Sequence, residues 1–213
     1  MRIIVFGAAG GVGTRVVAEA VSRGHQVTAA VRDPRRLAEL PAGAEPRLGN
    51  AADLADVVAL STGQDVVISA TRPLPGSEPD LVVTARTLLA GTARTGTRLL
   101  LVGGAASLVV PGTGGVTVVD DPRYMSPEYR AIALACADQH AACQADTAAD
   151  WTYLSPPALL RPGRRTGVFR LGRDELLVDA DGTSEISMED LAVALLDEAE
   201  RPRHRRARFT VAY

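Results

Sequence analysis

Short apolar runs alternate with longer amphipathic segments along the whole chain. The first run, RIIVFG at 2–7, is apolar toward both faces, as expected of a strand in the middle of a sheet. The segment 11–23 places its apolar residues at helical spacing and stops before Gly24. Repeated alternation of this kind predicts parallel strands joined by crossover helices, and hence an α/β fold.

The same pattern predicts the remaining elements. Asp33 before Pro34 is typical of a helix N-cap followed by a first helical residue. A Gly- and Pro-rich segment at 105–126 is longer than a compact domain usually tolerates, so we expect a lid or a wall over a substrate. Further strands are expected at 25–32, 45–50, 65–70, 98–104, 151–156 and 207–213, a hairpin at 166–179, and helices at 34–40, 51–60, 127–149 and 187–200, with another opening near Pro79.

The glycine-rich segment VFGAAGGVG joins the first strand to the first helix. In a dinucleotide site, Gly7 permits the tight turn, Gly10 lets the backbone approach the pyrophosphate, and Gly13 lets helix and strand pack closely. The helix start offers free N–H groups and a positive dipole end to the phosphates. The segment therefore predicts a Rossmann doubly wound parallel sheet, in strand order 3-2-1-4-5-6, that binds NAD(P). Further backbone contacts are expected from Ala9, Gly11 and Val12.

The end of the second strand, AAVRDP, bears on the choice between NAD and NADP. An acid at this place binds the ribose hydroxyls of NAD, whereas an arginine accommodates the extra phosphate of NADP. Arg32 is the natural phosphate ligand, with Arg35 or Arg36 as support. If Arg32 is only a solvated charge, Asp33 becomes the ribose ligand instead. Because Asp33 already has a capping role, the sequence favours NADP (NADPH), with NAD as the alternative.

No repeat, low-complexity tract or linker divides the chain, so we expect one NAD(P)-binding domain at 1–213. Its core is expected at 1–156, with a small C-terminal substrate-side extension at 157–213. Ligands of such sheets lie outside the carboxyl ends of the strands. Contacts are therefore expected to adenine from Asn50 and Ala51, and to ribose and pyrophosphate from Ala70, Thr71 and Arg72.

Composition narrows the picture further. All 23 basic residues are arginines, and with 25 acids the formal net charge is −2, which favours neither disorder nor a general nucleic-acid surface. The N-terminus lacks the order of regions typical of a signal peptide, and glycines and Pro111 interrupt the uncharged run 99–119, so no membrane span is expected. These features predict a cytoplasmic protein without a nucleic-acid partner. The arginine-rich run 201–208 follows an acidic helix that neutralises it, and it fits a solvated connection.

One helical stripe carries Tyr129, Cys136, His140 and Cys143. The last three could present soft ligands to zinc, but no fourth ligand is evident. Ile132 beside the stripe suggests ordinary packing against the sheet or a partner helix, so no metal is expected. The stripe is also a candidate face for a homodimer.

Several segments together resemble a known group of proteins. FGAAGGVG, AVRDP, LLLVGGAASL, DWTYLSPP, RTGVFRLG, ISMEDLAVALLDE and RFTVAY are similar to the atypical short-chain dehydrogenases of the NmrA-like and NADH-flavin-reductase-like group. The resemblance covers essentially the whole chain. It implies a Rossmann fold and an NAD(P) cofactor. In that group some members reduce flavins, quinones or carbonyl-type acceptors, and some bind the cofactor as regulators.

The resemblance also implies where the reaction would occur. It places the nicotinamide near Gly103 and Gly104 and near Ser155 and Pro156. Ser107 matches a catalytic serine that could hold a substrate oxygen, although a serine closing a strand-end turn is an equal alternative.

The matching tyrosine in classical members belongs to a YxxxK motif, but Tyr129 begins YRAIA and the chain has no lysine. Tyr129 is therefore either an unassisted hydrogen-bond donor or a packing residue at a helix start. The favoured function is an NADPH-dependent oxidoreductase that transfers hydride to a small-molecule flavin, quinone or carbonyl-type acceptor. The alternatives are a biosynthetic tailoring reductase or isomerase and a non-catalytic NADP-sensing regulator.

Overall fold

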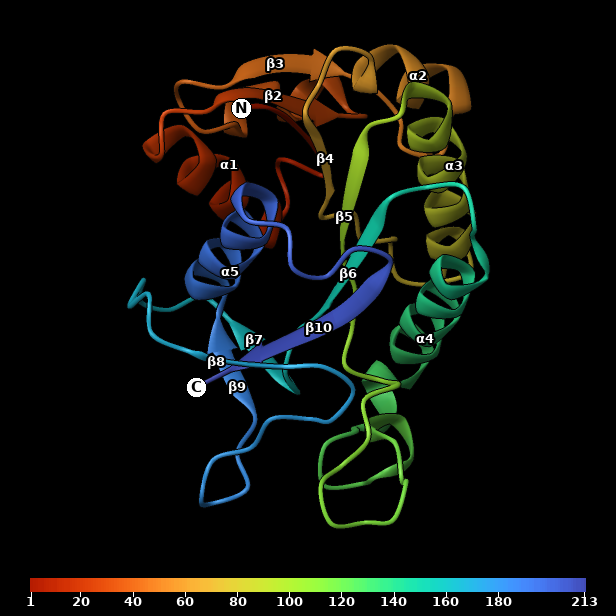
Figure 1. Ribbon diagram of the computed structural model, residues 1–213, viewed down its shortest axis with the longest axis vertical. Helices are drawn as coiled ribbons and strands as arrows, with labels where there is room; N and C mark the ends of the chain where they lie inside the picture. Colours follow the sequence, from red (N-terminus) through yellow and green to blue (C-terminus); the bar gives the residue numbers. More distant parts are fainter.

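The computed structural model describes residues 1–213, and its centre is an eight-stranded sheet (Figure 1). The strands of this sheet are β1 (Arg2–Phe6), β2 (Gln26–Val31), β3 (Glu45–Leu48), β4 (Val66–Ser69), β5 (Arg98–Val102), β6 (Trp151–Ser155), β8 (Arg170–Gly172) and β10 (Ala207–Ala212). Their order is β3-β2-β1-β4-β5-β6-β10-β8. The predicted order 3-2-1-4-5-6 is confirmed, with β10 parallel to β6 and β8 antiparallel to β10 beyond it.

Helices cover both faces of the sheet (Figure 1). The helices are α1 (Gly11–Ser22), α2 (Leu54–Ser61), α3 (Asp80–Thr95), α4 (Arg130–Ala145) and α5 (Met188–Glu200), with short 3₁₀ turns η1 (Pro34–Glu39), η2 (Val118–Asp120) and η3 (Pro127–Tyr129). The pair α1 and α5 packs on one face over a cluster of 23 buried apolar residues. The helices α2, α3 and α4 pack on the other face, over a second cluster of 15.

The part of the chain after β6 extends the sheet and does not form the expected hairpin. Strand β8 pairs with β10. The segment that begins at Glu175 instead lies beside the 105–126 segment, to which an isolated β-bridge between Val109 and Glu175 joins it. A separate small sheet forms from β7 (Leu159–Arg161) and β9 (Glu185–Ser187). The hairpin prediction is wrong because the partner of β8 lies nearly 40 residues away, where local pattern carries no signal.

The 105–126 segment is an ordered wall. Leu108, Val110, Val118 and Leu176 form a third buried cluster with residues of the C-terminal part. The Tyr124 hydroxyl donates to the Gly182 carbonyl at 2.9 Å, which ties the two parts together. Figure 1 shows these loops together at the end of the molecule below β5 and β10.

Part of the α4 stripe packs against the sheet of its own chain. Cys143 is fully buried in the second cluster, and the His140 ring lies 4.7 Å from the Tyr153 ring of β6. His140 and Cys143 are therefore covered by their own chain, whereas Tyr129 at the start of the stripe is exposed, and the homodimer stays a prediction. No helix is both long and apolar enough to cross a membrane.

Candidate functional site

The glycine loop has a geometry that only glycine permits at two of its positions. Gly7 has a φ of +77°, and a Cβ atom there would lie 2.6 Å from the Ala70 carbonyl oxygen. A Cβ atom on Gly13 would lie 2.0 Å from the Gly7 carbonyl oxygen. The loop is therefore folded tightly between β1, β4 and α1, as the sequence led us to expect.

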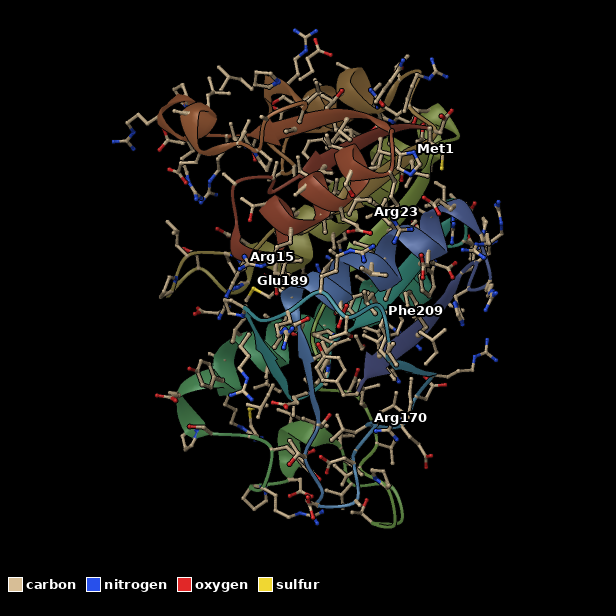
Figure 2. All side chains as sticks on the ribbon, turned by 90° about the vertical axis from the view of Figure 1, so that its left-hand side faces the viewer. Met1, Arg15, Arg23, Arg170, Glu189 and Phe209 are labelled. Atoms are coloured by element: carbon tan, nitrogen blue, oxygen red, sulfur yellow. The ribbon has the colours of Figure 1, made fainter.

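The start of α1 presents backbone to solvent. Gly10 is the N-cap and no side chain caps the helix, so the first-turn N–H groups have no partner in the chain. A Cβ atom on Gly11 would meet only the Met188 sulfur, at an ordinary 3.5 Å. Arg15 pairs with Glu189 at 2.6 Å, so α5 is fixed beside this helix start (Figure 2).

At the end of β2, hydrogen bonds within the chain fix the carboxylate of Asp33. The Asp33 carboxylate caps η1 and accepts a hydrogen bond from the Arg35 side chain at 2.7 Å, which lowers its pKa to about 2. Arg35 is 88% exposed and points to this partner. Arg36 instead donates to the Ala9 carbonyl at 2.7 Å, so it is the arginine that lies against the glycine loop. Arg32 is exposed and forms no ion pair within the chain.

The ends of β3 and β4 lie on either side of this arrangement. Asn50 is exposed and its side-chain oxygen accepts from the Ala52 N–H, while Ala51 is buried. The Ala70 N–H donates to the Phe6 carbonyl at 3.0 Å, so the β4 end lies directly beside the glycine loop. The Thr71 hydroxyl is bonded to Ser69 at 3.0 Å. The exposed Arg72 is near enough to α4 to oppose the rise that burial causes in the Cys136 pKa, which lies at about 11.

The glycines at the end of β5 make room for side chains. A Cβ atom on Gly103 would fall 1.9 Å from the hydroxyl oxygen of Tyr153, and one on Gly104 would fall 2.8 Å from the Cβ of Cys136. The Tyr153 hydroxyl donates to the Cys136 carbonyl at 2.9 Å and accepts from the Gly104 N–H at 3.3 Å. Burial raises the pKa of Tyr153 well above its usual value, so this phenol stays protonated.

Ser107 belongs to an ionic cluster that sequence reasoning missed. Arg208 of β10 donates from Nη1 to the Ser107 hydroxyl oxygen at 2.8 Å. Its other nitrogens donate to Asp174 at 3.0 and 2.7 Å. The Arg208 side chain is 7% exposed, whereas that of Asp174 is 71% exposed. A signal for Arg208 was present in the sequence, because an arginine stands inside the apolar strand ARFTVAY.

His140 lies beside this cluster. Burial, with the positive charge of Arg208 adding to it, lowers the pKa of His140 to about 4, while Asp174 opposes the change. His140 is therefore neutral near pH 7. No group of three acid, cysteine or histidine side chains converges on a point that could hold a metal ion.

Two buried hydroxyl groups face the same side of the sheet without a hydrogen-bond partner. These are Ser155 at the carboxyl end of β6 and Thr210, its neighbour across the strand pair. Pro156 is buried directly after Ser155. Tyr129 stands apart from them, because its ring is 55% exposed at the start of α4. The structure joins Ser107 to Arg208 and not to Tyr129.

The residues present fit a dinucleotide. The glycine loop leaves an uncapped helix start, two of its glycines are required by close backbone approach, and the unpartnered Ser155 hydroxyl stands at the carboxyl end of β6. Free N–H groups at a helix start bind phosphate, and an open carboxyl edge holds the rest of the ligand. The donor set is that of a Rossmann nucleotide site.

Comparison with known proteins agrees with this geometry. The NAD(P)H-binding family matches residues 7–202. The uncharacterized protein YwnB of Bacillus subtilis is 36% identical over 99% of this chain and 98% of its own length. A proposed NADH-flavin reductase of Streptococcus pneumoniae is 30% identical, with a TM-score of 0.88 over 100% of this chain and 99% of the other.

A third relative carries a different name. A proposed epimerase of Bacteroides thetaiotaomicron is 34% identical, with a TM-score of 0.90 over 100% of this chain and 96% of the other. The names of these relatives thus differ in reaction while their folds agree. The chain is an oxidoreductase-like member of the NAD(P)H-binding family, and its resemblance to NADH-flavin-reductase-like proteins is confirmed.

Proposed function

We propose that the protein is an NADPH-dependent oxidoreductase whose acceptor is a flavin, a quinone or a carbonyl-type small molecule. The observation that carries this proposal is the Ser107 hydroxyl, which accepts from Arg208 and keeps its own hydrogen free at the carboxyl edge of the sheet. Reduced nicotinamide, when bound, supplies a hydride. A hydroxyl hydrogen beside it suits an acceptor that gains negative charge on an oxygen atom.

In this proposal, each segment at the carboxyl edge of the sheet has its own role. The first-turn N–H groups of α1 bind the pyrophosphate, Ala70 and Thr71 lie along it, and the β5 and β6 ends hold the nicotinamide. The 105–126 segment would shield one side of the acceptor from water. Without a lysine the chain cannot build the tyrosine–lysine pair of classical members, so positioning and the Ser107 hydroxyl supply most of the catalysis.

Two observations support NADPH over NADH. The carboxylate of Asp33 is already bound by Arg35 and by the start of η1, which leaves it poorly placed for ribose hydroxyls. Arg32 is exposed at the same strand end without an ion-pair partner. A guanidinium in that position pairs well with a phosphate.

Calorimetry with NADPH and NADH tests the cofactor preference. We expect NADPH to bind at least about tenfold more tightly, and Arg32→Ser to remove most of that difference, since a charge-assisted bond contributes about 1.5–3 kcal/mol. Arg47→Ser is the matched control, because Arg47 is an exposed arginine on β3 that pairs with Glu45. Tighter binding of NADH by the unaltered protein would contradict the proposal.

The reaction itself is tested by NADPH oxidation with FMN, menadione and a panel of carbonyl compounds. We expect a rate above that of buffer with at least one class. Binding of NADPH without turnover of any acceptor would favour a regulator that senses the cofactor, or an enzyme with one dedicated intermediate.

A further inference from the structure

We propose that Arg208 is a positioning residue that orients the Ser107 hydroxyl and strengthens it as a hydrogen-bond donor to the acceptor oxygen. This inference rests on the proposed function. It gives the chain a cation beside the reacting hydroxyl without a lysine. Three features support this role: the direction of the Arg208–Ser107 hydrogen bond, the burial of the guanidinium and the placement of β10.

The direction of the hydrogen bond is fixed by chemistry. A guanidinium only donates, so at 2.8 Å from Nη1 the Ser107 oxygen must accept. A serine hydroxyl has one hydrogen, and in this arrangement that hydrogen points away from Arg208. No other hydrogen bond of the chain uses it, and Ser107 is half-buried, so the hydrogen is available to a bound molecule.

The burial of Arg208 makes its charge effective. The side chain is 7% exposed, and its one carboxylate partner, Asp174, is 71% exposed. In such a place the charge acts through a lower effective dielectric than at the surface, and hydrogen bonds in series polarise one another. Accepting from a cation therefore makes the Ser107 O–H group a stronger donor.

The placement of β10 brings the cation to the reaction edge. Arg208 lies opposite Tyr153 in the register of β10 and β6, and Tyr153 contacts Gly104 at the end of β5. Ser107 follows three residues later. Asp174 accepts from two other nitrogens of the same guanidinium, which holds its plane and aims Nη1 at Ser107.

A purely structural role for Arg208 makes a different prediction. Replacement of a buried ion pair by an apolar side chain of similar volume is often neutral or stabilising. If Arg208 serves the fold alone, Arg208→Met should leave the chemistry at position 107 unchanged. If it acts on Ser107, the same variant must change the acidity of a group placed there.

The first test uses a thiol as reporter and needs no cofactor. The alkylation rate of Ser107→Cys with iodoacetamide is followed against pH, with and without Arg208→Met. We expect the thiol at position 107 to have a pKa below the ordinary ~8.5, and to be about one unit or more higher once Arg208 is replaced. The native Cys136 and Cys143 give a low background, because burial raises their pKa values to about 11 and about 12.

Controls keep this test decisive. Arg205→Met removes an exposed arginine of the same segment that pairs with Asp150, and it should leave the thiol pKa unchanged. Arg208→Lys keeps a cation and should keep most of the lowered pKa. Equal thiol pKa values with and without Arg208 overturn the proposal. Should no neutral variant at position 208 fold, a pKa at or above ~8.5 in Ser107→Cys alone overturns it.

The second test uses turnover with NADPH and FMN as probe. We expect Ser107→Ala and Arg208→Met each to lower kcat by about tenfold or more, with the affinity for NADPH unchanged, and the double variant to fall no further than the worse single one. Independent, multiplying losses would overturn the proposal. Absence of turnover in the unaltered protein would instead count against the proposed function, because the thiol test reports on Arg208 without it.

Discussion

Glycines end both β1 and β5, but they are required for different reasons. Gly7 follows β1, and a Cβ atom on Gly13 of α1 would lie 2.0 Å from the backbone oxygen of Gly7. At the end of β5, a side chain on Gly103 would strike the Tyr153 side chain at 1.9 Å. In the first region a Cβ atom would clash with backbone atoms, and in the second it would clash with the side chain of Tyr153.

This difference shows how similar sequence features can serve different purposes. Backbone cannot move out of the way without undoing β1 and α1, so the Gly7–Gly13 contact is part of the nucleotide loop itself. At the end of β5 the clash is with a side chain, so a smaller residue in place of Tyr153 would remove it. Gly103 is therefore required by side-chain packing within the chain. From the sequence, the glycines of both regions were predicted to contact the cofactor. In the structure, packing against Tyr153 is enough to explain why position 103 is a glycine.

The largest effect is expected for Gly13→Ala. The new methyl group has no flexible neighbour to displace, so we expect a loss of more than about 3 kcal/mol in the free energy of unfolding, together with loss of NADPH binding. Urea unfolding and calorimetry measure the two quantities. Gly11→Ala is the matched control for the unfolding measurement, because its methyl group meets only Met188 at an ordinary distance. A folded Gly13→Ala protein that binds NADPH normally would break the comparison.

A smaller, repairable effect is expected for Gly103→Ala. Overpacking against Tyr153 should cost about 1–3 kcal/mol of unfolding free energy. Tyr153→Leu alone should also destabilise the protein, because it leaves a cavity and removes the hydroxyl bonds to Cys136 and Gly104. The double variant should be more stable than the sum of the two losses allows, as measured by a urea double-mutant cycle. If the two losses in unfolding free energy simply add, Tyr153 is not the reason why position 103 requires a glycine.

A gradual effect is expected from pH, and it should be confined to the β5 side. His140 packs on Tyr153 and has a pKa of about 4, below the ordinary ~6.5 of the unfolded chain. The stabilisation that neutral His140 gives to the folded protein is complete above about pH 6.5. It declines as the pH falls toward 4, because in that range only the unfolded chain takes up the proton. The loss should reach about 2 kcal/mol near pH 5.

Urea unfolding between pH 4 and pH 7 checks this expectation. His140→Gln removes the titrating group, and the unfolding free energy of that variant should depend less on pH in this range. The same slope in both proteins would show that His140 is not the source of the acid sensitivity.

Much of the fold could be predicted from the sequence because the signals are local. Gly7, Gly10 and Gly13 lie within seven residues, and each of the strands β1 to β5 is followed by a helix or a 3₁₀ turn, so strand order follows from rules for such units. The N-cap role of Asp33 was predicted for the same reason, and its side chain accepts from the backbone of η1.

The rest depended on contacts that are distant in sequence. Arg208 was read within a solvated run of arginines, yet it is buried because its partners Ser107 and Asp174 arrive from other parts of the chain. The inward packing of His140 and Cys143 on α4 could not be told from a dimer face, because small residues there fit the sheet as well as a second copy. Arg35 and Arg36 could not be separated by spacing, and only the structure shows that Arg36 lies on the glycine loop.

The hydrogen bond between Arg208 and Ser107 joins residues that are 101 positions apart. The strand pairs that form the nucleotide edge close over much shorter separations, since β1 pairs with β2 and β4 within the first 70 residues. Short closures cost less chain entropy and tend to form earlier. We therefore expect a newly made chain to form the nucleotide edge first, and the proposed reaction site only when β10 docks.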